Sequence, residues 1–392
     1  MASAPASRAP EVPFLRDPRV RSILWQVFLC LLLAAAALLF GYLAKLNLDR
    51  AHVTSGFGFW NQPAGFDISQ SLIEYSSSAS TYGRAFWVGL INTLVVAAVG
   101  IVLATIVGFV IGISRLSSNW LVAHLAAGYI QIVRNIPLLL QLLFWYNAVL
   151  KALPDFNQSI HLPGGGFLNN RGLYLPSADF GGGGAIILAA FGLGIVGAII
   201  MIALARRERV AAGTATGIAV ALLVGLPVIA ALASGTHVTF TFPELSRFNV
   251  HGGSEVIPEG VALVLGLVVY TGAFIAETVR AGLTAVPRGQ IEAAQALGLS
   301  RLTTLRRVII PQAMRVIIPP LTSQYLNLTK NSSLAVAIGY PDLVQIFTGT
   351  VLNQTGQAVE IVAITMVVYL VISLTTSFLM NMYNARMALR ER

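Results

Sequence analysis

Charged residues are scarce in this chain: only 10% of its 392 residues are Asp, Glu, Lys or Arg, while 56% are apolar. A soluble domain usually carries about 25% charged residues, because its surface faces water. So little charge excludes an ordinary soluble protein with a large apolar core. We expect lipid to be the solvent for most of this chain.

Cysteine and histidine are few, with one and five residues, and a phosphate-binding loop is lacking. The single cysteine, Cys30, excludes an intramolecular disulfide, and His237 and His251 have no third ligand at a metal-binding spacing. The glycine runs at 164–166 and 181–184 are not followed by lysine, so the chain has no Gly-x-x-x-x-Gly-Lys-Ser/Thr motif. We therefore predict no metal and no cofactor on this chain, and no nucleotide site of its own.

The first apolar run, from Ile23 to Leu43, has the features of either a signal peptide or a membrane span. It has about 20 residues, which is enough to cross a hydrocarbon core about 30 Å thick. No small-residue cleavage site closes it, and Lys45, Asp49 and Arg50 follow instead. We interpret it as a retained first span.

Seven further apolar segments follow, at 86–113, 121–150, 185–205, 214–233, 258–279, 312–328 and 359–381. Each should be helical, because a lipid-facing backbone has to satisfy its own hydrogen bonds. Arg315, Pro319 and Pro320 interrupt one segment, where a kinked or re-entrant helix is an alternative. The prediction is an all-α polytopic membrane protein with about eight transmembrane helices, joined outside the membrane by ordered but irregular loops.

The distribution of Lys and Arg predicts the orientation of these helices. If the N-terminus lies in the cytoplasm and eight spans follow, most of the basic residues fall on cytoplasmic segments. Both termini are therefore expected in the cytoplasm. The net charge of +9 is a signal of topology and does not indicate nucleic-acid binding.

The cytoplasmic segment 280–311 has a distinct local design. Pro287 and Gly289 end the preceding helix, and 290–297 is a run of strong helix formers. Gly298 follows at the position where a helix end favours a residue in the left-handed conformation. The pattern predicts a short helix that ends in a tight turn.

A second short helix, 301–310, is expected after this turn, capped by Ser300 and ended by Pro311. The first short helix should expose a face with little side-chain bulk, formed by Ala293, Ala294 and Ala296. Such a face suits close contact with another protein. The alternative is an amphipathic connector that lies on the membrane surface.

These residues resemble a known family. The matching positions are Glu292, Ala293, Ala294, Gly298, Val308 and Pro311, which resemble the EAA loop of binding-protein-dependent ABC import permeases. The family pattern has Ile and Leu where this chain has Val308 and Ile310. Segments 81–94, 129–141 and 327–343 resemble the polar amino-acid branch, and GFLNNRGL at 166–173 resembles the long permease subunit of general L-amino-acid transporters of Gram-negative bacteria.

The resemblance implies a type I ABC importer permease domain over 86–382, with a core of five helices at 86–113, 121–150, 258–279, 312–328 and 359–381. This chain adds an N-terminal region, 1–85, with an extra span and loop. An insertion, 151–257, carries two more spans, and 383–392 forms a cytoplasmic tail. An even number of inserted spans preserves the orientation of the coupling loop, 280–311.

The resemblance also implies a transport subunit that is not itself an enzyme. Its EAA loop would dock on a separate ABC ATPase subunit, which holds the ATP. A second permease subunit, identical or related, and a periplasmic solute-binding protein would complete an amino-acid importer in the bacterial inner membrane. Contact with nucleic acid is not expected.

Several polar residues within the predicted spans are candidates for the translocation path: Arg134, Asn92, Gln141, Asn327 and Thr329. Arg134 either binds a substrate carboxylate or caps a broken helix and anchors a neighbouring span, and we favour the structural role. Each of the others could equally be an interhelical contact. Glu277 and Arg280 are most simply a helix-surface ion pair.

The alternative function in another class is an ion-gradient-driven secondary transporter. That class needs polar or acidic groups near the membrane midplane. The carboxylates inside the predicted spans, Glu277 and Glu360, each lie close to a membrane surface. An enzyme would need paired carboxylates, a nucleophile with its base or a metal cluster, and the sequence offers none of these.

Overall fold

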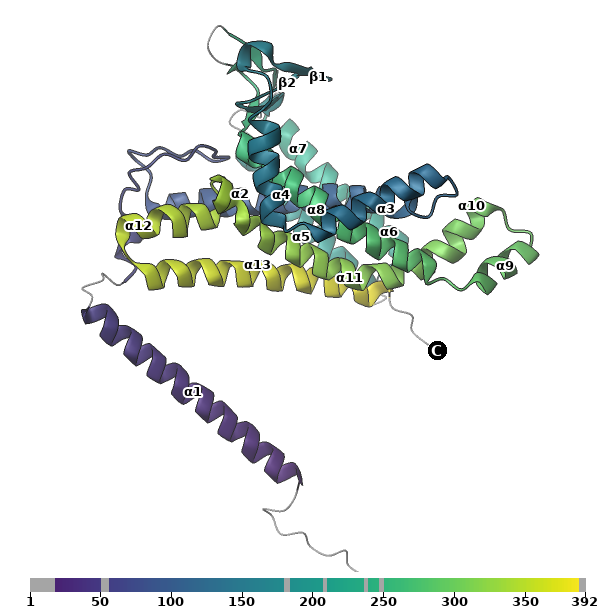
Figure 1. Cartoon of the computed structure of the whole chain (residues 1–392), viewed down its shortest axis with the longest axis horizontal. Helices are drawn as coiled ribbons and strands as arrows, with labels where there is room; N and C mark the ends of the chain where they lie inside the picture. The colour runs from purple at the N-terminus through teal and green to yellow at the C-terminus, as the bar shows by residue number, and fades with distance from the viewer. Residues whose placement is uncertain are drawn as a thin grey trace, which may run out of the picture.

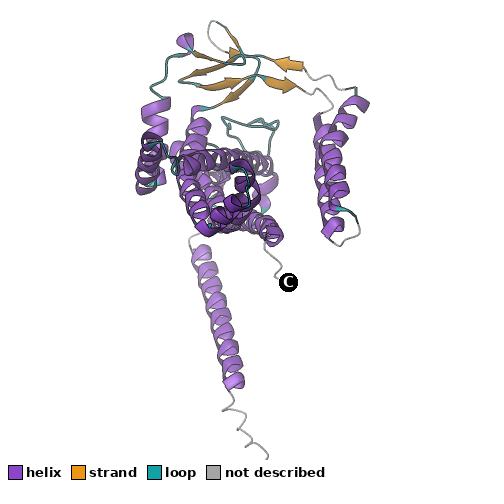
Figure 2. Ribbon diagram, turned by 90° about the vertical axis from the view of Figure 1, so that its right-hand side faces the viewer, coloured by secondary structure: helices purple, strands orange, loops and turns teal. Residues whose placement is uncertain are grey.

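The computed structural model describes residues 18–50, 56–179, 184–206, 210–235, 239–246 and 250–387. The described chain is mainly helical, with a small β-layer at one side of a helical core (Figures 1 and 2). Helix α1 (Pro18–Arg50) stands apart from the core, and its apolar side chains are exposed along its length. Its segment Arg21–Leu43 is long and apolar enough to cross a membrane.

Five helical regions form the core: α2 (Tyr82–Ser114), α3 (Trp120–Asn135) with α4 (Leu138–Leu143), α8 (Pro258–Thr284), α11 (Ile310–Asn331) and α13 (Ala358–Met387). They coincide with the five predicted core segments. Short helical pieces complete their connections: η3 (Phe144–Leu150), η8 (Ser332–Ile338), η9 (Gln345–Val351) and α12 (Leu352–Thr355).

All eight predicted segments are helical in the structure. Among the described residues, five helices are long and apolar enough to cross a membrane, or six if the bent pair α3–α4 is one span. Helix α11 falls outside this count, although it runs as one helix through Pro319 and Pro320. The described part of the segment at 185–205 contributes a shorter apolar stretch, Ala189–Ala198.

Glycines allow the core helices to approach closely. On α2, a Cβ added at Gly108 would collide with Ile275 of α8, and one at Gly112 would lie 2.7 Å from the carbonyl oxygen of Ala276. Small residues serve this purpose in membrane proteins, where van der Waals packing drives helix association. The two helices therefore pack closely in this part of their length.

The insertion forms a helical hairpin beside the core. Helix α5 (Gly184–Arg206) packs against the chain that returns through α6 (Ala212–Val220), η6 (Ala221–Gly225) and α7 (Leu226–Ala233). Figure 2 views the core along its helices, with this hairpin standing next to it and the β-layer spanning both. The two predicted inserted helices are confirmed as helices.

The loops predicted to be irregular contain short strands instead. Strands β1 (Ile160–Leu162), β2 (Gly166–Asn169), β3 (Gly172–Leu175) and β8 (Ser254–Val256) form an antiparallel sheet in the order β1-β2-β3-β8. Two further pairs are β4 (Ser177–Asp179) with β5 (Thr239–Thr241) and β6 (Glu244–Leu245) with β7 (Val250–His251). The β3–β8 pair joins the two ends of the insertion, a long-range contact that local patterns do not reveal.

Candidate coupling loop and polar cavity

The turn at Gly298 has the predicted left-handed geometry. Helix α9 (Arg288–Ala296) begins after Pro287 and ends where Gly298 adopts a φ of 71°. The Leu299 amide donates to the carbonyl oxygen of Ala294 at 3.1 Å, which is the long bond of a Schellman turn. The turn therefore sets the angle between α9 and the helix that follows it.

Helix α10 (Arg301–Thr304) is capped as predicted, because the Thr303 amide donates to the hydroxyl of Ser300 at 3.3 Å. The prediction that Pro311 ends this helix is wrong. The helical chain continues through the π-helical segment η7 (Leu305–Ile309) into α11, with Pro311 in its first turn. A π-helical turn accommodates the missing proline N–H and its ring, so the loop connects to α11 without a break.

The predicted coupling residues do not all lie on one exposed face. Glu292 and Ala293 are exposed, whereas Val308 and Pro311 are half-buried. Ala294 is only 3% exposed, which contradicts its prediction as part of an exposed small-residue face. Its side chain is buried, and its own backbone carbonyl accepts the hydrogen bond that closes the Schellman turn.

Two leucines that sequence analysis did not single out dominate the tip of the loop. Leu297 is 80% exposed, directly before Gly298, and Leu302 of α10 is 57% exposed. Exposed apolar side chains grouped at a protruding tip indicate an interaction surface. The sequence signal that could have revealed these leucines is their position on either side of the turn at Gly298, where a side chain has few neighbours to pack against.

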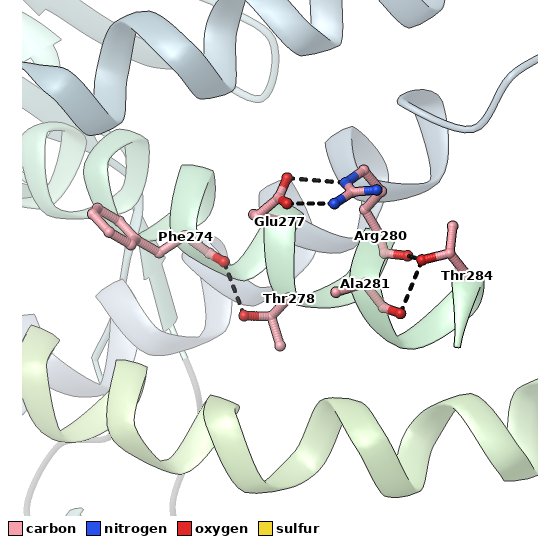
Figure 3. A network of polar contacts seen from close by, with 6 residues as sticks. All are labelled: Phe274, Glu277, Thr278, Arg280, Ala281 and Thr284. Carbon is pink, nitrogen blue, oxygen red and sulfur yellow. Dashed lines mark hydrogen bonds and ion pairs between the residues drawn. The ribbon is translucent and has the colours of Figure 1, made fainter. Parts of the chain in front are cut away.

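A polar cavity of about 560 Å³ lies where α2, α3 and α8 approach the coupling loop. It is lined by Arg115, Ala127, Ile130, Gln131, Arg134, Asn135, Phe274, Glu277 and Arg280. Glu277 and Arg280 form the predicted ion pair, with distances of 2.6 Å and 3.1 Å along its two hydrogen bonds (Figure 3). Because the lining has three arginines and one glutamate, the cavity carries an excess of positive charge.

Arg134 lies in the last turn of α3, and its guanidinium carbon is 5.0 Å from the centre of the Phe274 ring on α8. This cation–π contact attaches α3 to α8, as the predicted anchoring role requires. Arg134 also lines the cavity. Arg134 therefore contacts a neighbouring helix and also faces the cavity.

Gln141 satisfies the backbone at the break between α3 and α4. The two helices meet at 105°, and Gln141 Nε2 donates to the carbonyl oxygens of Val133 at 2.8 Å and Ile136 at 2.9 Å. Pro137 explains the break, because it disfavours a helical conformation in Ile136. Gln141, rather than Arg134, bonds the carbonyl groups freed at this break.

The other predicted path residues lie apart from this cavity. Asn92 of α2 is buried and bonded to two backbone carbonyl groups near the opposite end of the core. Thr329 is buried and donates to the carbonyl of Tyr325, whereas Asn327 is exposed on the same helix, α11. Of the five predicted path residues, Arg134 alone is among the described residues that line the cavity.

Comparison with known proteins identifies the family. The profile of binding-protein-dependent transport system inner membrane components matches residues 100–389. The chain belongs to this family. Its matched region contains α8, the coupling loop and α11, so the permease has the type I ABC permease fold that its sequence predicts.

Similar proteins extend over almost the whole permease. It is 50% identical over 379 residues to the general L-amino acid transport system permease protein AapQ of Rhizobium johnstonii, covering 96% of this chain and 94% of the relative. It is 51% identical over 382 residues to YhdX of Escherichia coli (strain K12), covering 96% of each chain. It is 39% identical over 408 residues to the glutamate/glutamine/aspartate/asparagine transport system permease protein BztB of Rhodobacter capsulatus, covering 96% of each. The N-terminal region and the insertion are therefore shared with full-length relatives.

Proposed function

We propose that this permease is the membrane-spanning subunit of an ATP-driven amino-acid importer. The observation that carries the proposal is the protruding α9–Gly298 turn, which bears the EAA-like residues on a family member. AapQ and BztB, both similar over nearly the full chain, are named as amino-acid transport permeases. We therefore propose L-amino acids as the transported class.

The coupling loop docks on a separate ABC ATPase subunit. Exposed Leu297 enters an apolar groove of the ATPase, and Glu292 and Ala293 flank it. Because η7 continues into α11, a displacement of α9 passes directly into a core helix. ATP binding thus shifts the equilibrium between states of the permease that differ in their ATPase contacts.

The loop lies in the cytoplasm, with both termini on the same side of the bacterial inner membrane. One coupling loop engages one ATPase unit, and an ABC importer has two ATPase units. A second permease subunit, identical or related, therefore completes the membrane unit. A periplasmic solute-binding protein delivers the substrate to the opposite face.

The polar cavity receives the amino acid on the cytoplasmic part of its path. Its excess of arginine suits the carboxylate that every amino acid carries. Arg280 is ion-paired with Glu277, so we assign the binding of this carboxylate to the guanidinium group of Arg134. Glu277 provides a carboxylate within reach of an ammonium group in the same lining. A cavity of this size accommodates a free amino acid.

Arg134→Met is expected to raise the KM for uptake on the order of tenfold, since charge-assisted hydrogen bonds contribute about 1.5–3 kcal/mol. Arg134→Lys, which keeps the charge, should retain most of the affinity. The measurement is the concentration dependence of L-glutamate uptake in right-side-out vesicles that contain ATP. Equal KM values for both variants and wild type would assign Arg134 to the Phe274 contact alone.

The test of the proposed function is uptake by proteoliposomes that contain the permease, its partner permease, the ATPase and the binding protein. We expect uptake of L-amino acids that requires ATP and persists after an ionophore collapses the ion gradients. Uptake that continues without ATP and stops with the ionophore would instead establish an ion-driven secondary transporter.

A further inference from the structure

Residues 56–81, called the strap here, fold over the end of the core opposite to α9 and α10 (Figure 1). The strap begins with the short helix η2 (Gly58–Asn61). Its Trp60 ring lies 5.2 Å from that of Phe86 on α2 and 6.2 Å from that of Phe347 on η9. An aromatic cluster therefore attaches the strap to two core elements.

The strap is internally ordered by hydrogen bonds. The Ala64 amide donates to the carbonyl of Ser80 at 2.8 Å, and the Tyr75 hydroxyl donates to the carbonyl of Phe66 at 2.8 Å. Burial, together with the nearby charge of Asp67, raises the pKa of Tyr75 to about 12. Its hydroxyl thus remains a donor throughout the physiological pH range, and the segment between these bonds is held as a fixed loop.

Gln70, at the middle of this loop, sits where three core elements converge. Asn92 Nδ2 of α2 donates both to the Gln70 carbonyl and to the Pro341 carbonyl, each at 2.9 Å. The Gln70 Oε1 atom lies 3.3 Å from the position that a Cβ on Gly260 of α8 would occupy, and Tyr340 lies 3.0 Å from the same point. The strap thus bridges α2, α8 and the turn after η8 in one contact.

Two buried oxygen atoms at this contact lack hydrogen-bond donors. Asn92 is 1% exposed, and its Nδ2 group faces two carbonyl oxygens, so its Oδ1 atom points away from them and has no donor. Gln70 Oε1 is also buried and without a donor. Unsatisfied buried acceptors destabilise the arrangement that contains them. The contact therefore holds two amide oxygens that accept no hydrogen bond from a protein donor.

We propose that the strap is the outer gate of the translocation path, with Gln70 and Asn92 as the residues that position it in the closed state. The proposal rests on the proposed function, in which the end opposite to the coupling loop faces the periplasm. Alternating access requires the translocation path to open at this face in one of the two states. The strap must then leave Gly260, and the two freed amide oxygens become acceptors for the ammonium group of an entering amino acid.

Thiol accessibility in the assembled transporter tests this gate. Gln70→Cys is made in a Cys30→Ser background, so that the permease carries a single thiol. A membrane-impermeant maleimide is added from the periplasmic side. The labelling rate is measured at rest and during ATP-driven turnover with binding protein and L-glutamate. We expect labelling about tenfold faster during turnover, as a shift from a closed to an open population requires. Leu72→Cys, which is 58% exposed on the same strap, serves as the matched control and should label at one fast rate in both conditions.

Asn92→Ala provides a second measurement, because it removes the donor that holds the Gln70 carbonyl. Combined with Gln70→Cys, it should raise the resting labelling rate toward that of Leu72→Cys. Equal labelling of Gln70→Cys at rest and during turnover, in a transporter that still hydrolyses ATP in response to binding protein and L-glutamate, would overturn the gate. Absence of ATP-dependent uptake in the Cys30→Ser background and in wild type would instead refute the proposed function.

Discussion

Gly298→Val is expected to abolish ATP-driven uptake while the permease remains in the membrane. The φ of 71° at Gly298 costs an L-residue about 1–2 kcal/mol, and a β-branched side chain is strongly disfavoured there. Relief of this strain would open the Schellman turn and change the direction of α9. The measurement is uptake in vesicles together with the amount of ATPase that co-purifies with the permease.

Gly289→Val is the matched control for this substitution. Gly289 lies within α9, and a Cβ added there meets no atom within 4 Å. We expect this variant to retain ATPase binding and most of the uptake. If both variants behave alike, the left-handed turn has no special role in coupling.

Gly282→Ala is expected to lower the thermal stability of the permease and its uptake. An added Cβ at Gly282 of α8 would collide with Ile317 of α11 and lie 3.2 Å from the carbonyl oxygen of Ala313. Overpacking of this kind costs about 1–3 kcal/mol. Because this contact joins α8 and α11, the two helices that lead into and out of the coupling loop, we expect the uptake rate to fall even below the unfolding temperature. A thermal-unfolding midpoint in detergent and an uptake rate measure the two effects.

Ile317→Ala tests whether the loss arises from this contact. Alone, truncation of the fully buried Ile317 should destabilise the protein by about 2–5 kcal/mol, because it leaves a cavity. Combined with Gly282→Ala, the two changes should compensate in part, since the new methyl group fills space that the isoleucine vacated. Strictly additive losses of stability would show that the defect of Gly282→Ala does not arise from the contact with Ile317.

Sequence patterns predicted the features that depend on local chemistry. The left-handed turn at Gly298 and the Ser300 cap each follow from the backbone preferences of one or two residues. The Glu277–Arg280 pair follows from helical spacing alone. The apolar segments similarly predicted the core helices, because lipid requires helical backbone.

Features that depend on distant contacts were not predicted. Ala294 is buried because the chain folds back over it after Gly298, and β3 pairs with β8 across the whole inserted hairpin. The π-helical turn that carries the chain past Pro311 has no local signature. Gln70 gained its importance only from its position between α2 and α8, which no spacing within the strap reveals.

The central claim is that the α9–α10 tip contacts a separate ATPase. The most direct measurement places a photo-crosslinking amino acid at Leu297 in the transporter assembled in the native membrane, with the same substitution at the exposed Leu72 of the strap as the control. We predict an adduct between the permease and the ATPase subunit from position 297 and none from position 72. An active transporter that gives no ATPase adduct from position 297 would contradict the coupling role of this loop.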